Sequence, residues 1–252
     1  MAKKYEDGFN LEGKVAMVTG AAAGIGQAVA ELFAAQGASL VLLDLSQEIH
    51  EVAKRLPGSH LPIACNVASL VQIEEAVKQA ETRFGTIDIL VNNAGVALLN
   101  KADLVTETEW DTTMSVNLKA AFFLSQAVAR IMAQKGKGQI VNLASQASVI
   151  ALDRHVAYCA SKAAMVSMTE VLAIEWAASG ITVNAISPTV VETALGKKAW
   201  AGEVGEAMKK KIPAGRFAQP EEIAAAALYL VSEHSRMITG ANLLIDGGYT
   251  IQ

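Results

Sequence analysis

A tyrosine and a lysine lie four residues apart in the segment YCASK, residues 158–162. The surrounding residues 156–178 have the apolar spacing of a helix, so Tyr158 and Lys162 would leave the same helix face. A phenol with its ordinary pKa of about 10 is a poor base at neutral pH. A neighbouring ammonium favours the phenolate and lowers that pKa. The pair could therefore move a proton to or from a substrate hydroxyl, although most Tyr–Lys pairs at this spacing are surface residues.

Two further polar residues could join this pair. Ser145 ends the apolar run QIVNLAS, thirteen residues before the tyrosine. A serine at the end of a strand and a tyrosine on the next helix can converge in one cleft, where Ser145 would hold the substrate oxygen. Asn117, in the preceding helical segment, could fix a water that links Lys162 to solvent.

The elements that must position these residues alternate along the chain. Short apolar, β-branched runs are expected to form strands at residues 14–20, 39–44, 60–65, 87–94, 139–145, 181–187 and 241–246. Their continuous apolar character is typical of strands covered on both faces of a parallel sheet. Helical patterns occupy residues 25–36, 69–84, 107–134, 156–178 and 220–231. The sequence therefore predicts one α/β domain over residues 1–252, a Rossmann-type doubly wound parallel sheet of about seven strands with helices on both faces.

The first strand leads into TGAAAGIG, residues 19–26. Gly20, Gly24 and Gly26 allow a tight turn and close backbone approach to a pyrophosphate, and the helix that starts near Ile25 points its N–H groups at the phosphates. A plain glycine-rich turn is the alternative. Because the loop follows a strand and opens a helix, we expect a dinucleotide site.

The second strand ends at Asp44, whose carboxylate can accept hydrogen bonds from the adenosine ribose and would repel a 2′-phosphate. No cation stands at the neighbouring positions Leu45 and Ala23. The sequence thus predicts NAD rather than NADP, and a strand-end cap is the other interpretation of Asp44. Further cofactor contacts are expected after the third and fourth strands, from Asn66, Val67, Asn93, Ala94 and Gly95.

Together these motifs resemble the short-chain dehydrogenase/reductase family, over nearly the whole chain from LEGKVAMVTG to IDGGY. The resemblance rests on the motifs TGAAAGIG, NNAG, the serine of NLAS, YCASK and ISPTVVET. It implies a catalytic tetrad of Asn117, Ser145, Tyr158 and Lys162, with the tyrosine as general acid/base and the lysine also on the nicotinamide ribose. It further implies that Pro188, Val191 and Thr193 lie near the nicotinamide carboxamide, and that the protein is a homotetramer. Thr189 replaces the usual glycine after Pro188, and Asn66 replaces the usual aspartate.

The substrate is expected to be a small hydroxylated molecule, since Gln146 and His155 offer hydrogen bonds and aromatic residues are only 5% of the chain. His155 could equally be structural. Residues 194–212, with the large apolar Trp200, could form a lid over the substrate or an ordinary surface helix. The sequence also resembles the branch of the family that oxidises diols and polyols such as 1,2-propanediol and threitol. A 3-oxoacyl-carrier-protein reductase, a sugar dehydrogenase, a non-catalytic NAD-binding regulator and a scaffold protein are the alternatives.

Composition excludes several other classes. The net charge is −4 and basic residues are scattered, which argues against nucleic-acid binding. No apolar stretch is long enough for a membrane span, and no His/Cys spacing indicates a metal site. Two cysteines, Cys65 and Cys159, are expected to be free thiols in a reducing cytoplasm.

Overall fold

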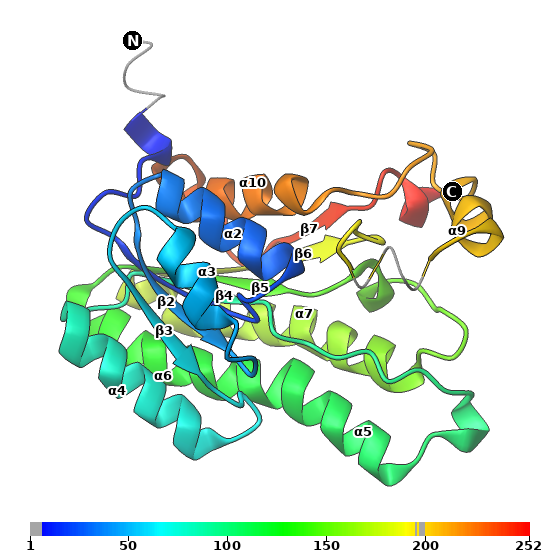
Figure 1. Cartoon of the computed structure of the whole chain (residues 1–252), viewed down its shortest axis with the longest axis horizontal. Helices are drawn as coiled ribbons and strands as arrows, with labels where there is room; N and C mark the ends of the chain where they lie inside the picture. The colour runs from blue at the N-terminus through cyan, green and yellow to red at the C-terminus, as the bar shows by residue number, and fades with distance from the viewer. Residues whose placement is uncertain (1–6, 195, 197–199) are drawn as a thin grey trace.

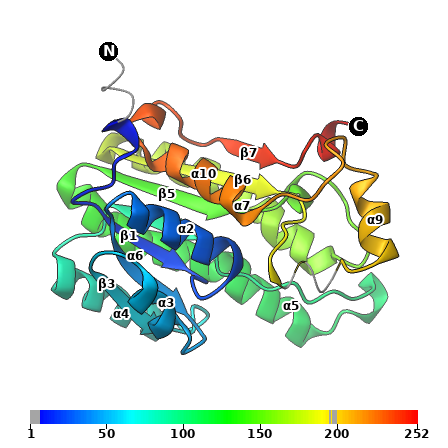
Figure 2. The same cartoon turned by 45° about the horizontal axis from the view of Figure 1, so that its top comes forward.

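Seven parallel strands form one sheet, in the order β3-β2-β1-β4-β5-β6-β7. The computed structural model describes residues 7–194, 196 and 200–252. The strands are β1 Val15–Thr19, β2 Ser39–Asp44, β3 His60–Ala64, β4 Ile89–Asn92, β5 Gly138–Leu143, β6 Ile181–Pro188 and β7 Asn242–Ile245. Each predicted strand is present, and the predicted doubly wound parallel sheet is confirmed (Figures 1 and 2).

Helices cover both faces of the sheet (Figure 1). Their bounds are α2 Gly24–Ala35, α3 Ile49–Arg55, α4 Leu70–Phe84, α5 Glu107–Met114, α6 Ala120–Lys135, α7 Val156–Trp176, α9 Glu203–Lys209 and α10 Pro220–Val231. Helices α2, α3 and α10 lie on one face, and α4, α6 and α7 lie on the other. Within the described ranges, none of the helices has the length and apolar character that crossing a membrane requires.

Strand β1 shows why the strands read as continuous apolar runs. All five of its residues are buried. Ala16 and Val18 pack in the core under α2 and α10, whereas Val15 and Met17 pack in the core under α4 and α6. Side chains alternate between the two faces, and each face is apolar because a helix layer covers it.

Two helical features were not predicted. Helix α3 has only seven residues, too few for a clear apolar period. The long helical segment expected at 107–134 is α5 and α6 joined by a π-helical turn at Ser115–Lys119, in which the Ala120 N–H donates to the Ser115 carbonyl, five residues back. Such turns are rare and often lie at functional sites. This one carries Asn117.

Strand β1 lies between β2 and β4, so the direction of chain progression through the sheet reverses there. Crevices at the carboxyl ends of strands flanking such a switch point are the usual ligand sites of open α/β sheets. The glycine loop follows β1, the NNAG segment follows β4, and Ser145 follows β5 by two residues. The fold therefore brings the predicted motifs to one edge.

Candidate active site

The glycine loop has the geometry that a pyrophosphate requires. Gly20 and Gly24 have φ values of 65° and 59°, which side chains disfavour. A Cβ on Gly26 would lie 2.1 Å from the Gly20 carbonyl oxygen, so only glycine fits there. Helix α2 begins at Gly24 with Ala23 as N-cap and no side-chain cap. Its first N–H groups therefore remain available to an anion.

Asp44 is held against this loop. Its Oδ2 accepts a hydrogen bond from the Ala22 N–H, and its Oδ1 accepts one from the Ser46 N–H, each at 2.9 Å. The carboxylate is half-buried, and it places a fixed negative charge beside the glycine loop. That position suits ribose hydroxyls and disfavours a second phosphate on the ribose.

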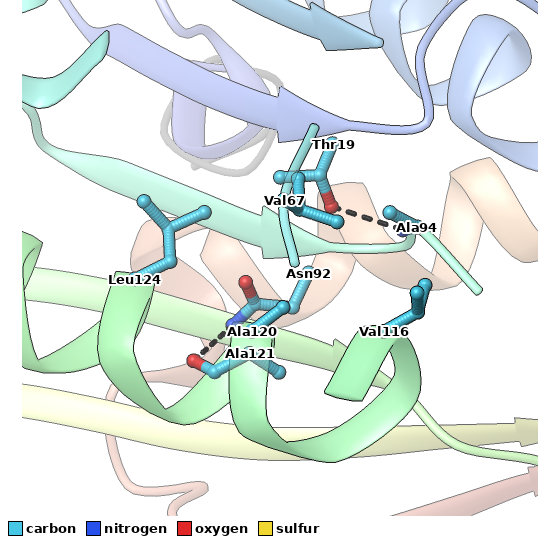
Figure 3. A pocket seen from close by; sticks show the side chains of 8 residues that line it. All are labelled: Thr19, Val67, Asn92, Ala94, Val116, Ala120, Ala121 and Leu124. Carbon is cyan, nitrogen blue, oxygen red and sulfur yellow. Dashed lines mark hydrogen bonds between the residues drawn. The ribbon is translucent and has the colours of Figure 1, made fainter. Parts of the chain in front are cut away.

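The end of β4 is tied to the same loop by a residue that sequence reasoning missed. Thr19 Oγ1 accepts from the N–H groups of Asn93 and Ala94, both at 2.9 Å, and Figure 3 shows the bond to Ala94. Asn93 Nδ2 donates to the carbonyls of Thr19 and Gly20 at 2.9 and 3.1 Å. The hydroxyl at the last position of β1, directly before the first glycine, was the signal available.

The predicted residues after β3 reach the same edge. Val67 is buried and lines a small pocket with Thr19 and Asn92 (Figure 3). Asn66 is exposed, and its Oδ1 accepts from the Ala68 N–H at 3.0 Å. This turn leaves the Asn66 amide nitrogen as the group that could face an adenine.

Residues that follow β6 lie next to the glycine loop. Strand β6 ends at Pro188, and Val191 pairs with Ala218. The methyl group of Thr193 lies 3.0 Å from the position of a Cβ on Gly24. The predicted carboxamide segment and the predicted phosphate loop therefore face each other.

Tyr158 and Ser145 meet as predicted. The Ser145 side chain lies close enough to the phenol to lower the pKa of Tyr158, and Ser145 Oγ accepts from the Ala147 N–H at 3.1 Å. Ser145 is buried. Its hydroxyl is thus oriented by the short 3₁₀ turn Gln146–Ser148 and by the catalytic candidate on α7.

Lys162 lies beside the tyrosine, with its Nζ 5.7 Å from the centroid of the Tyr158 ring. The ammonium donates to the Leu143 carbonyl at 2.6 Å, which is the last residue of β5. The side chain is buried, and desolvation lowers the pKa of Lys162 to about 8.

The expectation that Lys162 lowers the pKa of Tyr158 is not met. Burial raises the pKa of Tyr158 above its ordinary value, and the hydrogen bond from Ser145 opposes this rise. The lysine lies over the ring and donates to Leu143 rather than to the phenol oxygen. In this arrangement the serine is the group that favours the phenolate.

The Asn117 side chain is bonded to the loop after β4 and to α7, and its expected contact with a water stays a prediction. Its Oδ1 accepts from the Val96 N–H at 2.8 Å, and its Nδ2 donates to the Val96 carbonyl at 2.9 Å and to Ser161 Oγ at 3.2 Å. Both amide hydrogens are therefore committed, and the side chain joins the loop after β4 to α7.

Two of the predicted substrate residues lie next to this centre. His155 is the N-cap residue of α7, and its ring centroid is 6.0 Å from that of Tyr158 in an edge-on arrangement. Its Nδ1 lies 2.5 Å from the Asp153 carbonyl. Gln146 is 3% exposed, and its Oε1 has no hydrogen-bond partner. The Thr189 hydroxyl, which sequence reasoning did not select, is also buried and unpartnered.

The third predicted substrate residue, Trp200, belongs to a small apolar cluster. Its ring centroid lies 6.1 Å from that of Phe217, and the cluster also contains Val190, Met208, Ile212 and Tyr249. This packing is what the surface-helix alternative for residues 194–212 predicts, and a lid over the substrate stays a prediction. Residues 195 and 197–199 of that segment lie outside the described residues. The chain's C-terminus lies next to α9 (Figure 1).

Across the part of the chain that the structure describes, no group of three His, Cys, Asp or Glu side chains could hold a metal ion.

Comparisons with known proteins agree with this geometry. A family model described as enoyl-(acyl carrier protein) reductase matches residues 20–250. An NAD-dependent glycerol dehydrogenase from Listeria innocua is 57% identical over 251 residues, 99% of each chain. A D-threitol dehydrogenase from Mycolicibacterium smegmatis is 52% identical over 248 residues, 97% of this chain and 95% of that protein.

Among solved structures, a 3-ketoacyl-(acyl-carrier-protein) reductase from Brucella melitensis in complex with NADH has a TM-score of 0.91 at 34% identity, covering 96% of this chain and 100% of that one. The family model spans the glycine loop to the C-terminal turn, residues 20–250, as the motifs do. The chain belongs to the short-chain dehydrogenase/reductase family.

Proposed function

We propose that this protein is an NAD-dependent polyol dehydrogenase, which transfers a hydride between a secondary alcohol of a small diol or polyol and the nicotinamide. The observation that carries the proposal is the meeting of Tyr158, Ser145 and Lys162 at the carboxyl edge of the sheet, beside the glycine loop. The names of the two similar relatives, a glycerol and a threitol dehydrogenase, support this substrate class.

The residues present fit a dinucleotide. Gly20, Gly24 and the uncapped start of α2 would hold the pyrophosphate, and Asp44 would hold the adenosine ribose. Asp44 favours NAD over NADP because its charge would repel a 2′-phosphate. When bound, the nicotinamide supplies the hydride acceptor.

The chain's own residues handle the proton and the oxygen. In its phenolate form, Tyr158 takes the proton of the substrate hydroxyl at its phenol oxygen. Ser145 directs its one hydroxyl hydrogen to the substrate oxygen and stabilises it as its charge changes. Lys162 adds a positive charge next to the ring. Because burial raises the pKa of Tyr158, alcohol oxidation should increase as the pH rises above neutrality.

The substrate side favours a molecule with several hydroxyl groups. Gln146 Oε1 is a buried acceptor without a partner, and burial of such a group is unfavourable until a donor reaches it. A second hydroxyl on the substrate is a suitable donor. His155 offers a further polar contact at the edge of the Tyr158 ring.

A 3-oxoacyl-carrier-protein reductase or a sugar dehydrogenase of the same family is the second candidate, supported by the likeness to the Brucella reductase. Asp44 argues against an NADP-dependent reductase. A non-catalytic NAD-binding regulator has no use for a tyrosine and a serine brought together beside a buried lysine.

Self-association into a homotetramer is part of the proposal. Val156, Val171 and Ile174 are exposed on α7, and Leu243 and Leu244 are exposed on the edge strand β7. Large apolar side chains exposed on a helix face and at a sheet edge suit contacts between copies. A cytoplasmic location is proposed from the free thiols of Cys65 and Cys159.

The decisive experiment is a coupled absorbance assay of purified protein with NAD and, separately, with NADP. The panel contains glycerol, 1,2-propanediol, threitol, aldoses and a β-hydroxyacyl thioester at mildly alkaline pH. Turnover of a diol or polyol with NAD is the expected result. Turnover of the thioester or an aldose alone would move the protein to the second candidate.

A further inference from the structure

Helix α7 is held by two hydrogen-bonded clamps of the same construction. In the first, Ser161 Oγ donates to the Tyr158 carbonyl at 2.8 Å and accepts from Asn117 Nδ2 at 3.2 Å. In the second, Thr169 Oγ1 donates to the Met165 carbonyl at 2.8 Å and accepts from Asn142 Nδ2 at 2.9 Å. Each hydroxyl has one hydrogen, which its own helix receives, so it can only accept from the asparagine.

The second clamp continues through the core to the cofactor side. Asn142 Oδ1 accepts from Asn92 Nδ2 at 2.8 Å, and the same nitrogen donates to Ser125 Oγ at 2.9 Å. Figure 3 shows the Asn92 side chain directed toward α6, where it also approaches the Ala121 carbonyl. Asn92 directly precedes the Asn93–Gly95 segment that is tied to the glycine loop. A chain of side-chain bonds thus joins this segment to α7.

All members of this chain are buried: Asn92 is 4% exposed, and Ser125, Asn142 and Thr169 are fully buried. Packing alone does not require their polar atoms, because valine has nearly the shape of threonine and no polar group to satisfy. A buried amide that is fully paired, by contrast, specifies one arrangement of the elements that it joins.

We propose that Thr169 and Asn142 are positioning residues for the catalytic reaction, which set the rotation and axial position of α7. A helix held at one point can pivot about it, whereas two clamps eight residues apart fix its direction. Their separation is about 12 Å at the usual rise per residue. Leu143, next to Asn142 on β5, accepts the bond from Lys162, so one strand segment holds the helix at both the lysine and the threonine.

The proposal rests on the proposed function, and its test compares Thr169→Val with Thr169→Ser. The matched control is Thr113→Val, because Thr113 is also fully buried and its hydroxyl donates to its own helix, to the Glu109 carbonyl at 2.7 Å. For Thr169→Val we expect kcat for the polyol to fall about tenfold to hundredfold, with KM for NAD within about twofold. Thr169→Ser should retain most of the activity, and the control should keep the wild-type kcat.

The pH profile separates positioning from mere loss of stability. Ser145 lowers the pKa of Tyr158, so displacing α7 and its phenol from Ser145 should move the rise of kcat with pH to higher pH in Thr169→Val. The other titratable groups near the phenol, Lys162, Cys159 and His155, are unchanged in every variant. If Thr169→Val matches the control in kcat and in pH profile, the proposal is wrong. If the valine variant is insoluble, Thr169→Ala is judged by the same two readouts.

Failure of the proposed function would be visible separately, as wild-type protein that turns over no polyol. In that case the phenolate absorbance of Tyr158 is titrated as the difference between each protein and its Tyr158→Phe counterpart. This readout needs no substrate. A higher apparent pKa of Tyr158 in Thr169→Val than in Thr113→Val supports the positioning role, and equal values overturn it.

Discussion

The two sides of the crevice differ in how their polar groups are satisfied. On the cofactor side, Thr19, Asn93 and Asp44 bind backbone groups of neighbouring loops, so the chain itself fixes the geometry. On the substrate side, Gln146 Oε1 is buried without a partner; in the described part of the chain the one other such side-chain atom is Thr189 Oγ1, in the segment expected near the nicotinamide. These three cofactor-side groups are thus paired within the protein and leave the N–H groups at the start of α2 for the ligand, whereas Gln146 leaves a side-chain acceptor for the substrate. Binding of the dinucleotide and choice of alcohol should therefore respond to different substitutions.

The largest effect should come from substitution of Tyr158, which lies between the cofactor side and the substrate side. Tyr158→Phe removes only the phenol oxygen, so kcat for polyol oxidation should fall by about a thousandfold or more while the Kd for NAD changes by less than about threefold. Steady-state kinetics and NADH fluorescence measure the two quantities. Tyr229→Phe, on α10 and 38% exposed, is the control. Near-normal turnover by Tyr158→Phe would contradict the mechanism.

Asp44→Asn tests the cofactor side alone. Removing the charge while keeping the shape should lower the ratio of kcat/KM for NAD to that for NADP by about tenfold to hundredfold, since a hydrogen bond to a charged group contributes about 1.5–3 kcal/mol. KM for the polyol should stay within about twofold. An unchanged cofactor ratio would mean that the carboxylate only caps the strand, through its bonds to Ala22 and Ser46.

Lys162 joins the two sides, and its burial predicts a pH-dependent stability. Its pKa is lowered to about 8 in the folded protein, so between about pH 8 and 10.5 the unfolded chain binds more protons and stability rises with pH. Relative to Lys162→Met, the wild-type free energy of unfolding should increase by about 2–3 kcal/mol between pH 7 and pH 10. Urea denaturation of both proteins at the two pH values measures this. A difference that does not vary with pH would show that the ammonium is not desolvated.

The smallest effect should come from the substrate side. Gln146→Leu removes the unpartnered acceptor and should raise KM for the polyol by about tenfold or less, with KM for NAD unchanged. KM should be measured with glycerol and with a monohydroxy alcohol of similar size. Only glycerol has a second hydroxyl that could bond Gln146, so the substitution should raise KM for glycerol more than for the monohydroxy alcohol. Equal effects on both alcohols would place Gln146 outside substrate recognition.

The sequence predicted the features that depend on local pattern. Strands that are buried on both faces consist of continuous apolar residues, which the sequence shows directly. The glycines of TGAAAGIG are equally direct, because a tight turn at a pyrophosphate requires residues without a side chain. The positions of Tyr158, Lys162 and Ser145 followed from helix spacing and strand ends.

The remaining features depend on which side chains meet across elements. Thr19 stands at a suggestive position before the first glycine, but only the fold shows that its hydroxyl accepts from the backbone N–H of Asn93. Likewise, only the fold shows that the Thr169 hydroxyl accepts from the Asn142 side chain. The direction of the pKa shift of Tyr158 was mispredicted for the same reason. Spacing places a lysine one turn away, but it gives neither the depth of burial nor the Leu143 carbonyl that binds the ammonium.

The π-helical turn at Ser115–Lys119 makes the active site sensitive to the loss of a single residue. It contains one residue more than the matching stretch of α-helix would. Deleting that residue would give α5 and α6 a regular common helix with the two flanking helices in nearly their present phase, and the side chains inside the turn would point in new directions. Asn117 would leave Val96 and Ser161. A relative shortened by one residue here should therefore be a well-folded protein with an impaired active site, which stability measurements alone would score as intact.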